Sequence, residues 1–106
     1  MAACGGYRPG LGPFHAGTFE SIVAHIPGLD VAIPSMAADA AGMLNAAFRG
    51  ERPTVLFYPK ALLNDPTRST SRDVAHQFVP IGTARIVYVG IDLTLIEPVP
   101  EICTGR

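Results

Sequence analysis

Apolar residues recur at helical spacing in a short segment near the N-terminus. The spacing i, i+3, i+4 and i+7, typical of one helix face, is met by Phe19, Ile22, Val23 and Ile26. Thr18 precedes this pattern and can cap a helix start, whereas Pro27 and Gly28 follow it and can end the helix. We therefore predict a short amphipathic helix over these residues.

A second helical pattern follows Ser35, which can act as its N-cap. The apolar positions that share one face are Met36, Ala40, Met43, Leu44, Ala47 and Phe48. Gly50 comes directly after the last turn, where glycine commonly ends a helix. The sequence therefore predicts a helix from about residue 36 to residue 49.

Two apolar runs flank this second helix and have the composition of strands. Leu29–Ile33 is a short run ended by Pro34, and Thr54–Tyr58 is almost continuously apolar. Runs of this kind are expected where a strand is covered on both faces. Strand, helix and strand in this order predict a βαβ unit, and the fold class is α/β.

The remaining segments are richer in glycine, proline and polar residues. The segment from Cys4 to Pro13 has so many glycines and prolines that we predict a loop. From Pro59 to Phe78 the chain is mostly polar, which favours a surface segment with a turn at Asn64–Pro66 and a solvated linker at Ser69–Asp73.

Two β-prone runs follow the polar segment. Thr83–Val89 and Leu93–Ile96 surround a turn centred on residues 90–92. This pattern favours a β-hairpin.

Composition narrows the class of protein. Of the 106 residues, 48% are hydrophobic and 16% charged, which is enough apolar material for one core. The net charge is −1 without a run of Lys and Arg, so we expect no nucleic-acid partner. Apolar stretches are too short to span a membrane, and no secretory pattern opens the chain, so we expect a soluble, cytoplasmic protein.

Cys4 and Cys103 lack the spacing of metal ligands, and free thiols are favoured over a disulfide between them.

His15 is the strongest candidate for chemistry. It lies between the glycine-rich segment and the first predicted helix. Helix N–H groups and the helix dipole would favour a neutral imidazole there that exchanges protons. A histidine that only packs or caps is the alternative. His25 is expected to play a structural role at the end of the helix, and His76 to be solvated.

Other polar residues give weaker signals. The carboxylates Glu20, Asp39, Asp65 and Asp73 are spread over different elements and show no catalytic pair. The glycines of the first segment match neither a Walker pattern nor a Rossmann fingerprint.

An ordered series of motifs resembles one known family. The motifs are Gly12-Pro13-Phe14-His15, Phe19-Glu20, Ala24-His25-Ile26-Pro27-Gly28-Leu29, Ile33-Pro34-Ser35, Asp39-Ala40-Ala41-Gly42-Met43-Leu44, Pro59-Lys60-Ala61-Leu62 and Val79-Pro80-Ile81-Gly82-Thr83-Ala84-Arg85. Together they span about residues 5–96. The chain resembles the beta chain of the decarboxylating component of 2-oxo acid dehydrogenases, of the pyruvate and branched-chain types.

This resemblance implies a fold and a domain division. The fold would be a partial transketolase-type pyrimidine-binding domain with a βαβ unit. A short β-hairpin that begins the C-terminal domain would follow it. Residues 1–78 would form the second half of the pyrimidine-binding domain and a linker. Residues 79–106 would start the C-terminal domain and end in an unmatched tail.

The resemblance also implies a cofactor, an activity and partners. In the family, thiamine diphosphate with magnesium is held between two domains, and a 2-oxo acid is oxidatively decarboxylated. The implied partners are an alpha chain or missing half with the pyrophosphate domain, and the lipoyl domain of the acyltransferase component. His15 would be the catalytic residue. The family usually continues with Ser-Gln where this chain has Ala16-Gly17.

Some members of the family bind potassium through backbone carbonyls at the end of the helix. The matching positions are Ala47, Phe48, Gly50 and Arg52. The family's Asp and Asn are absent at Gly50 and Arg52, so a plain helix C-cap is favoured.

The matched motifs lack the cofactor-activating glutamate and the pyrophosphate domain of the family. The sequence therefore predicts a fragment, a truncated frame or a decayed copy that is inactive alone and that forms homo-oligomers or aggregates. The alternative function is a noncatalytic α/β interaction module.

Overall fold

Three short parallel strands form the centre of the structure. The computed structural model describes residues 1–5, 12–83, 86 and 88–93. Strand β3 (Thr54–Pro59) lies in the middle, with β1 (Ala2–Cys4) on one side and β2 (Asp30–Ala32) on the other. Both neighbours run parallel to β3, with Ala2 beside Phe57 and Asp30 beside Thr54. The two outer strands are therefore staggered along the central one.

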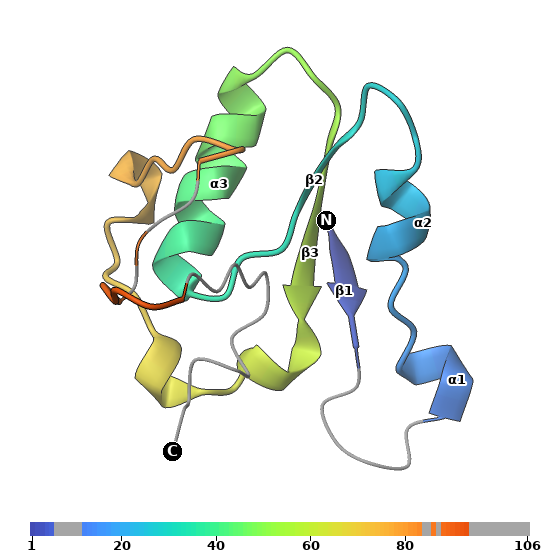
Figure 1. Ribbon diagram of the computed structural model, residues 1–106, viewed down its shortest axis with the longest axis horizontal. Helices are drawn as coiled ribbons and strands as arrows, with labels where there is room; N and C mark the ends of the chain where they lie inside the picture. The colour runs from blue at the N-terminus through green and yellow to red at the C-terminus, as the bar shows by residue number, and fades with distance from the viewer. Residues whose placement is uncertain (6–11, 84–85, 87, 94–106) are drawn as a thin grey trace.

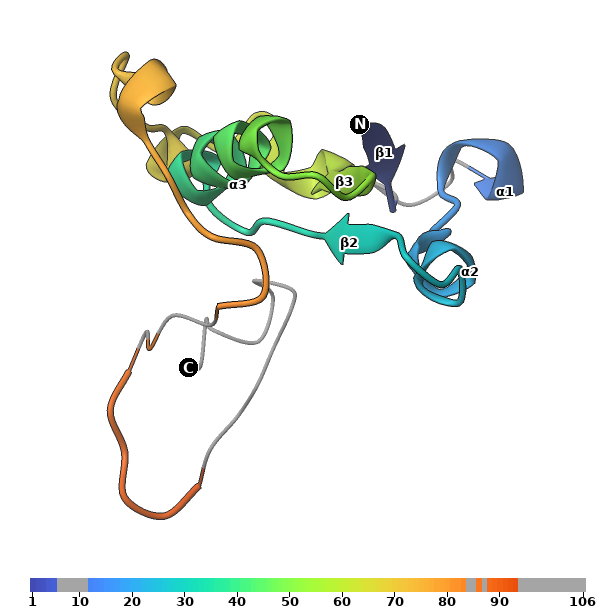
Figure 2. The same cartoon turned by 90° about the horizontal axis from the view of Figure 1, so that it is seen from above.

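Helices lie on both sides of this small sheet (Figures 1 and 2). Helix α3 (Ala37–Arg49) connects β2 to β3 and lies on one side. Helices α1 (Gly12–His15) and α2 (Glu20–Ala24) connect β1 to β2 and lie on the other. The predicted βαβ unit is thus present, because parallel strands need a crossover connection of this kind. The α/β class is confirmed.

The core lies at the middle of β3. Leu56 and Phe57 are both 2% exposed, and successive side chains of a strand point to opposite faces. Both faces of the strand are therefore covered at this point, as the continuous apolar run predicted. Cys4 on β1 and Ala32 on β2 are also buried, as are Pro34 and Gly42.

The helix starts differ from the sequence prediction. The N-cap of α2 is Phe19 and not Thr18, and the N-cap of α3 is Met36 and not Ser35. Neither Phe19 nor Met36 makes a side-chain cap hydrogen bond. Pairing of β2 with β3 holds the chain extended up to Ala32, and Met36 is still in an extended conformation (φ −122°, ψ 146°). The strand and its exit therefore determine where α3 begins, one residue later than the capping pattern suggests.

The described ends of the predicted N-terminal loop overlap regular elements. Ala2–Cys4 pairs with β3, and Gly12–His15 forms one turn of helix, although the sequence predicted a loop from Cys4 to Pro13. Local propensity does not favour a strand at Ala2–Cys4, but β3 supplies hydrogen-bond partners for its backbone. The rest of that predicted loop, residues 6–11, lies outside the described residues.

The polar segment after β3 forms three single turns of 3₁₀ helix: η1 (Lys60–Leu62), η2 (Pro66–Arg68) and η3 (Val74–His76). Residues 69–73 within it are mostly exposed, as predicted for a solvated linker. The Asn45 side-chain amide on α3 donates to the carbonyl oxygens of Val74 and Gln77, at 2.8 Å each. Helix α3 thus holds the segment against its outer face. The predicted turn at Asn64–Pro66 is confirmed, since Asp65 is the N-cap of η2.

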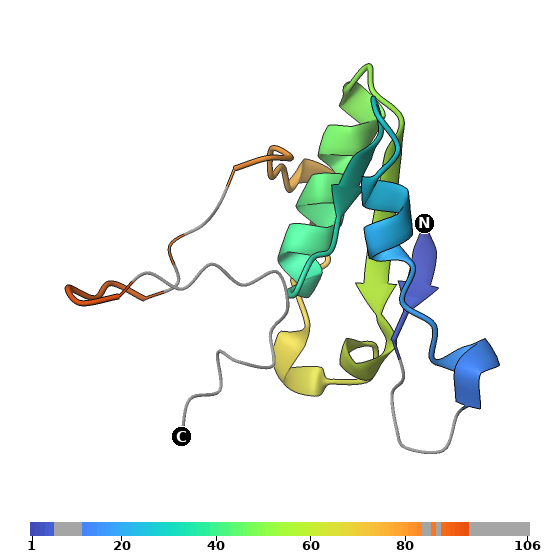
Figure 3. The same cartoon turned by 45° about the vertical axis from the view of Figure 1, so that its right-hand side comes forward.

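The predicted hairpin is not formed in the residues that can be compared. Thr83, Ile86 and residues 88–93 are not in strands, and residues 94–96 lie outside the described part of the chain. Residues 88–93 extend away from the sheet (Figure 3). Val89 and Ile91 are 90% and 98% exposed, so no core lies beneath them. A two-stranded hairpin is marginal in water without such a core.

Candidate functional site

The candidate catalytic residue His15 lies close to the residues at which β1 and β3 end. Cys4 is the last residue of β1, and Lys60 directly follows β3. The Lys60 ammonium donates a hydrogen bond to the backbone carbonyl oxygen of His15, which ends α1. In open parallel sheets, ligands bind outside the carboxyl ends of the strands. His15 therefore lies at the carboxyl ends of the strands, where a ligand is expected.

The environment of His15 differs from the one predicted. His15 is the last residue of α1 and not the start of a longer helix, and its side chain is exposed. The helix N-terminal groups that were expected to act on its imidazole are therefore not placed around it, because the chain makes a separate turn before α2 begins. What the structure offers instead is an accessible imidazole at the carboxyl end of the sheet.

The buried Cys4 thiol and the partly buried Glu20 carboxylate lie near Lys60. Burial raises the pKa of the Cys4 thiol, the Glu20 carboxylate raises it further, and the Lys60 ammonium opposes them. Cys4 is 5% exposed, so this thiol is shielded from solvent and is not a reactive nucleophile. Glu20 begins α2, and its buried Oε2 atom has no hydrogen-bond partner. Sequence reasoning singled out neither Lys60 nor Cys4 as part of a site, although Lys60 stands directly after an apolar strand.

Gly17, where the family motif usually has glutamine, lies close to the Phe19 ring. A Cβ atom at Gly17 would lie 2.5 Å from the Phe19 ring. The phenyl ring occupies the space that a larger side chain at position 17 would need. A side chain at position 17 would therefore require the exposed Phe19 ring to move.

The four residues of the predicted potassium site lie at the end of α3 and in the turn that follows it. The Gly50 N–H donates to the carbonyl oxygens of Ala46 and Ala47, as a helix C-cap does. The Arg52 carbonyl accepts from Thr54 Oγ1 at 3.3 Å, and its guanidinium pairs with Asp30 at 3.0 Å. Two of the four carbonyls thus already have internal donors, and the C-cap is the role that the geometry supports.

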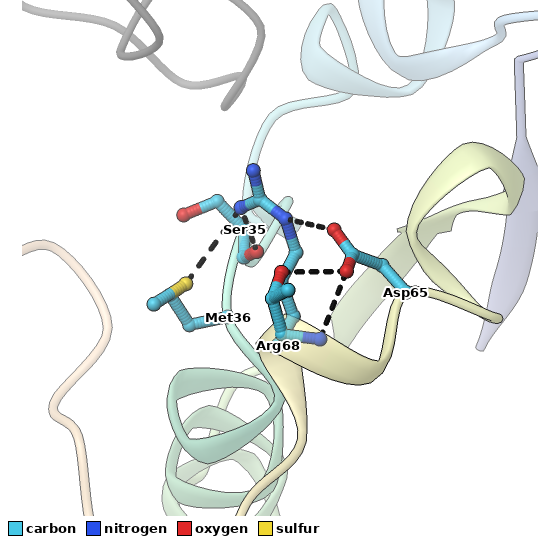
Figure 4. Close-up of polar contacts among 5 residues, drawn as sticks. Ser35, Met36, Asp65 and Arg68 are labelled. Atoms are coloured by element: carbon cyan, nitrogen blue, oxygen red, sulfur yellow. Dashed lines mark hydrogen bonds and ion pairs between the residues drawn. The ribbon is translucent and has the colours of Figure 1, made fainter.

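A cleft of about 510 Å³ opens between the start of α3, the end of β3 and the turns η1 and η2. Tyr58, Leu62 and Leu63 contribute to its wall. Arg68 also lines the cleft, and its guanidinium donates to the Asp65 carboxylate at 3.0 Å, to the Ser35 carbonyl oxygen at 3.2 Å and to the Met36 sulfur at 3.7 Å (Figure 4). These contacts tie η2 to the start of α3 and give the cleft its shape.

The Asp65 carboxylate makes the stability of this corner pH-dependent. Hydrogen bonds from the Thr67 side chain and backbone, with the Arg68 guanidinium, hold the pKa of Asp65 below its usual value. A carboxyl with a lowered folded-state pKa stabilises the fold above its unfolded value of about 4, and this contribution is lost as the pH falls through the folded pKa. We expect Asp65→Asn to remove that part of the pH dependence, measured as melting temperature between about pH 7 and 2. A matched variant, Asp73→Asn, should retain it.

The other two histidines occupy peripheral positions. His25 is the C-cap residue of α2, at the helix end where the sequence placed it, and is exposed. His76 is 82% exposed but is hydrogen-bonded to the Asp73 carboxylate, so it is not merely solvated. Within the part of the chain that the structure describes, no three His, Cys, Asp or Glu residues gather as a metal site. None of the described helices is long and apolar enough to cross a membrane.

The chain is thus a parallel α/β domain with an accessible histidine, His15, at the carboxyl ends of its strands. Residues 6–66 match the family described as "Transketolase, pyrimidine binding domain". The chain belongs to this family.

Curated relatives narrow the comparison. The chain is 36% identical over 85 residues to the 2-oxoisovalerate dehydrogenase subunit beta, mitochondrial, of Dictyostelium discoideum, which covers 80% of this chain and 22% of that protein. It is 39% identical over 84 residues to the pyruvate dehydrogenase E1 component subunit beta of Rhizobium meliloti, covering 78% and 18%. The corresponding subunit beta-2 of Oryza sativa is 34% identical over 91 residues, covering 85% and 24%. The chain thus spans about a fifth to a quarter of the length of these relatives. No solved structure matches.

Proposed function

We propose that the chain contributes part of the pyrimidine-binding domain of a beta subunit in a thiamine-diphosphate-dependent 2-oxo acid dehydrogenase of the pyruvate or branched-chain type. The observation that carries the proposal is the position of His15, exposed at the carboxyl ends of β1 and β3. The names of the similar proteins, which act on pyruvate or 2-oxoisovalerate, support this substrate class.

In this proposal the chain's own residues bring an imidazole to the reacting centre. A histidine can donate or accept a proton near neutral pH, and positioned acid-base help contributes about 10²–10⁴-fold to rate. Thiamine diphosphate supplies the electron sink for decarboxylation when it is bound. The role of the chain is to hold His15 where it can pass a proton to the substrate or acyl group.

The remaining parts of the complex belong to the proposal. An alpha subunit with the pyrophosphate domain and magnesium would complete the cofactor site, and a lipoyl domain would receive the acyl group. Potassium binding by the carbonyls of Ala47, Phe48, Gly50 and Arg52 stays the less favoured alternative to a helix C-cap, whereas the cytoplasmic location and homo-oligomer formation stay predictions. Several of the similar proteins are named as mitochondrial.

A graft into a working enzyme tests the role of His15. The matched segment of the Rhizobium meliloti beta subunit would be replaced by residues 12–83 of this chain, and turnover of pyruvate would be measured with its alpha subunit. His15→Ala in this graft should lower turnover by about 10²–10⁴-fold, the usual loss for an acid-base residue. His76→Ala, which removes an exposed imidazole far along the chain, is the control and should leave turnover unchanged. Equal turnover in both variants would reject the proposal.

A noncatalytic interaction module is the second candidate function, and one observation favours it. Apolar side chains in and directly around α2 are not covered within the described residues: Phe19, Ile22 and Ile26 are 55%, 65% and 52% exposed. An apolar stripe of this kind is typical of a surface that another chain covers. A graft that assembles with the alpha subunit but gives no turnover, even with His15 present, would favour this candidate.

A further inference from the structure

Helix α1 buries none of its own residues. It has four residues, and Phe14 in it is 94% exposed. A helix of this length is not stable in water by itself, because the first turn costs more backbone entropy than one hydrogen bond returns. The position of His15 must therefore be fixed by contacts from other elements.

Two hydrogen bonds connect this turn and the residues after it to the ends of the strands. The Gly5 N–H, directly after β1, donates to the Gly17 carbonyl oxygen at 3.1 Å. The Lys60 ammonium, directly after β3, donates to the carbonyl oxygen of His15 itself. The two bonds hold residues 15 and 17 from neighbouring strands, although Lys60 is 45 residues away along the chain.

The bond from Lys60 is the one that acts on His15 directly. It has a charged donor, which makes it stronger than a bond between neutral groups. Its acceptor is the carbonyl of the last helical residue, a group that has no partner within the helix. Because the carbonyl and the side chain share the same Cα, fixing the carbonyl also fixes the direction in which the imidazole leaves the backbone.

We propose that Lys60 is a positioning residue for His15, fixing the backbone of α1 to the carboxyl end of β3 so that the imidazole faces the reacting centre. The proposal rests on the proposed function for the importance of His15. The contact itself belongs to the 106-residue chain and can be tested there without any activity.

The test compares Lys60→Met with Lys60→Arg in the 106-residue chain by NMR. Methionine keeps much of the length of the side chain but cannot donate, whereas arginine can still donate to a carbonyl. In Lys60→Met we expect the ¹⁵N order parameters of His15 and Ala16 to fall from about 0.85 to below about 0.6. The imidazole signals of His15 should move, and those of His76 should not. In Lys60→Arg both changes should be largely reversed.

Two internal references make the result decisive. The Gly50 amide, in the C-cap of α3, reports global loosening and should be unchanged in both variants. Unchanged order parameters at His15 in Lys60→Met would overturn the proposal, as would an equal loss of order at Gly50 or a Lys60→Arg variant that behaves like Lys60→Met. None of these results depends on turnover, so failure here is distinguishable from failure of the His15→Ala graft.

Discussion

Phe57→Ala is expected to lower the free energy of unfolding by about 3–5 kcal/mol, the usual loss when a buried phenylalanine is truncated in a core. Phe57 is 2% exposed and is the largest fully buried side chain among the described residues. It lies on the central strand β3 and pairs in register with Ala2 of β1. Small domains have total stabilities of about 5–15 kcal/mol, so this single change should remove a large share of the stability. Urea denaturation followed by circular dichroism measures the loss.

Phe48→Ala is the matched control for this prediction. The same side chain is removed, but Phe48 lies on α3 and is 82% exposed. Surface substitutions of this kind usually change stability by less than about 0.5 kcal/mol. Similar losses for the two variants would mean that β3 is not the centre of the core, or that Phe48 is covered by a second molecule in solution.

Side-chain periodicity predicted the regular elements that flank the core. The apolar run at 54–58 became β3, and the helical pattern after Ser35 became α3, because both patterns are continuous and both elements pack within the chain. The predicted start of each helix was wrong by one residue. Capping preferences are local and contribute about 1 kcal/mol, whereas pairing of β2 with β3 fixes the backbone that leads into α3.

The elements that sequence reasoning missed depend on contacts between distant residues. Ala2–Cys4 has no strong strand signal of its own, and it becomes β1 only because β3 offers an open edge. Conversely, Thr83–Val89 carries a strand signal, but its described residues find no sheet to join. Strand propensity reflects packing against neighbours, so the same kind of sequence gives different results in different surroundings.

The candidate site was predictable in one residue only. His15 was found from its position and from the family motif, but its contact with Lys60 joins residues that are 45 positions apart. No periodicity or spacing rule covers such a pair. Lys60 had two weaker signals: it belongs to the motif Pro59-Lys60-Ala61-Leu62, and it stands directly after a buried strand, where ligands bind to parallel sheets.

Gly42→Ala is expected to lower the free energy of unfolding by about 1–3 kcal/mol, the usual cost of overpacking. Alanine in a helix interior normally stabilises by up to about 1 kcal/mol relative to glycine. Here a Cβ atom at Gly42 would lie 2.9 Å from the backbone nitrogen of Val79 and 2.7 Å from its Cγ2 atom. The side chain could turn away, but the backbone nitrogen could not move without separating residues 74–79 from α3. Thermal denaturation measures the loss, and a changed Val79 amide signal in NMR should accompany it.

Gly50→Ala separates this clash from the general effect of removing a glycine. Gly50 has a φ of −82°, so it does not use the left-handed conformation that glycine favours at helix ends. A Cβ atom there would lie 3.5 and 3.6 Å from the carbonyl oxygens of Ala46 and Ala47, which is ordinary contact. We therefore expect Gly50→Ala to be neutral or to stabilise by up to about 1 kcal/mol through the unfolded state. If Gly42→Ala stabilised the chain as much as Gly50→Ala does, the segment after η3 would not be packed on α3, and Gly42 would be an ordinary helix glycine.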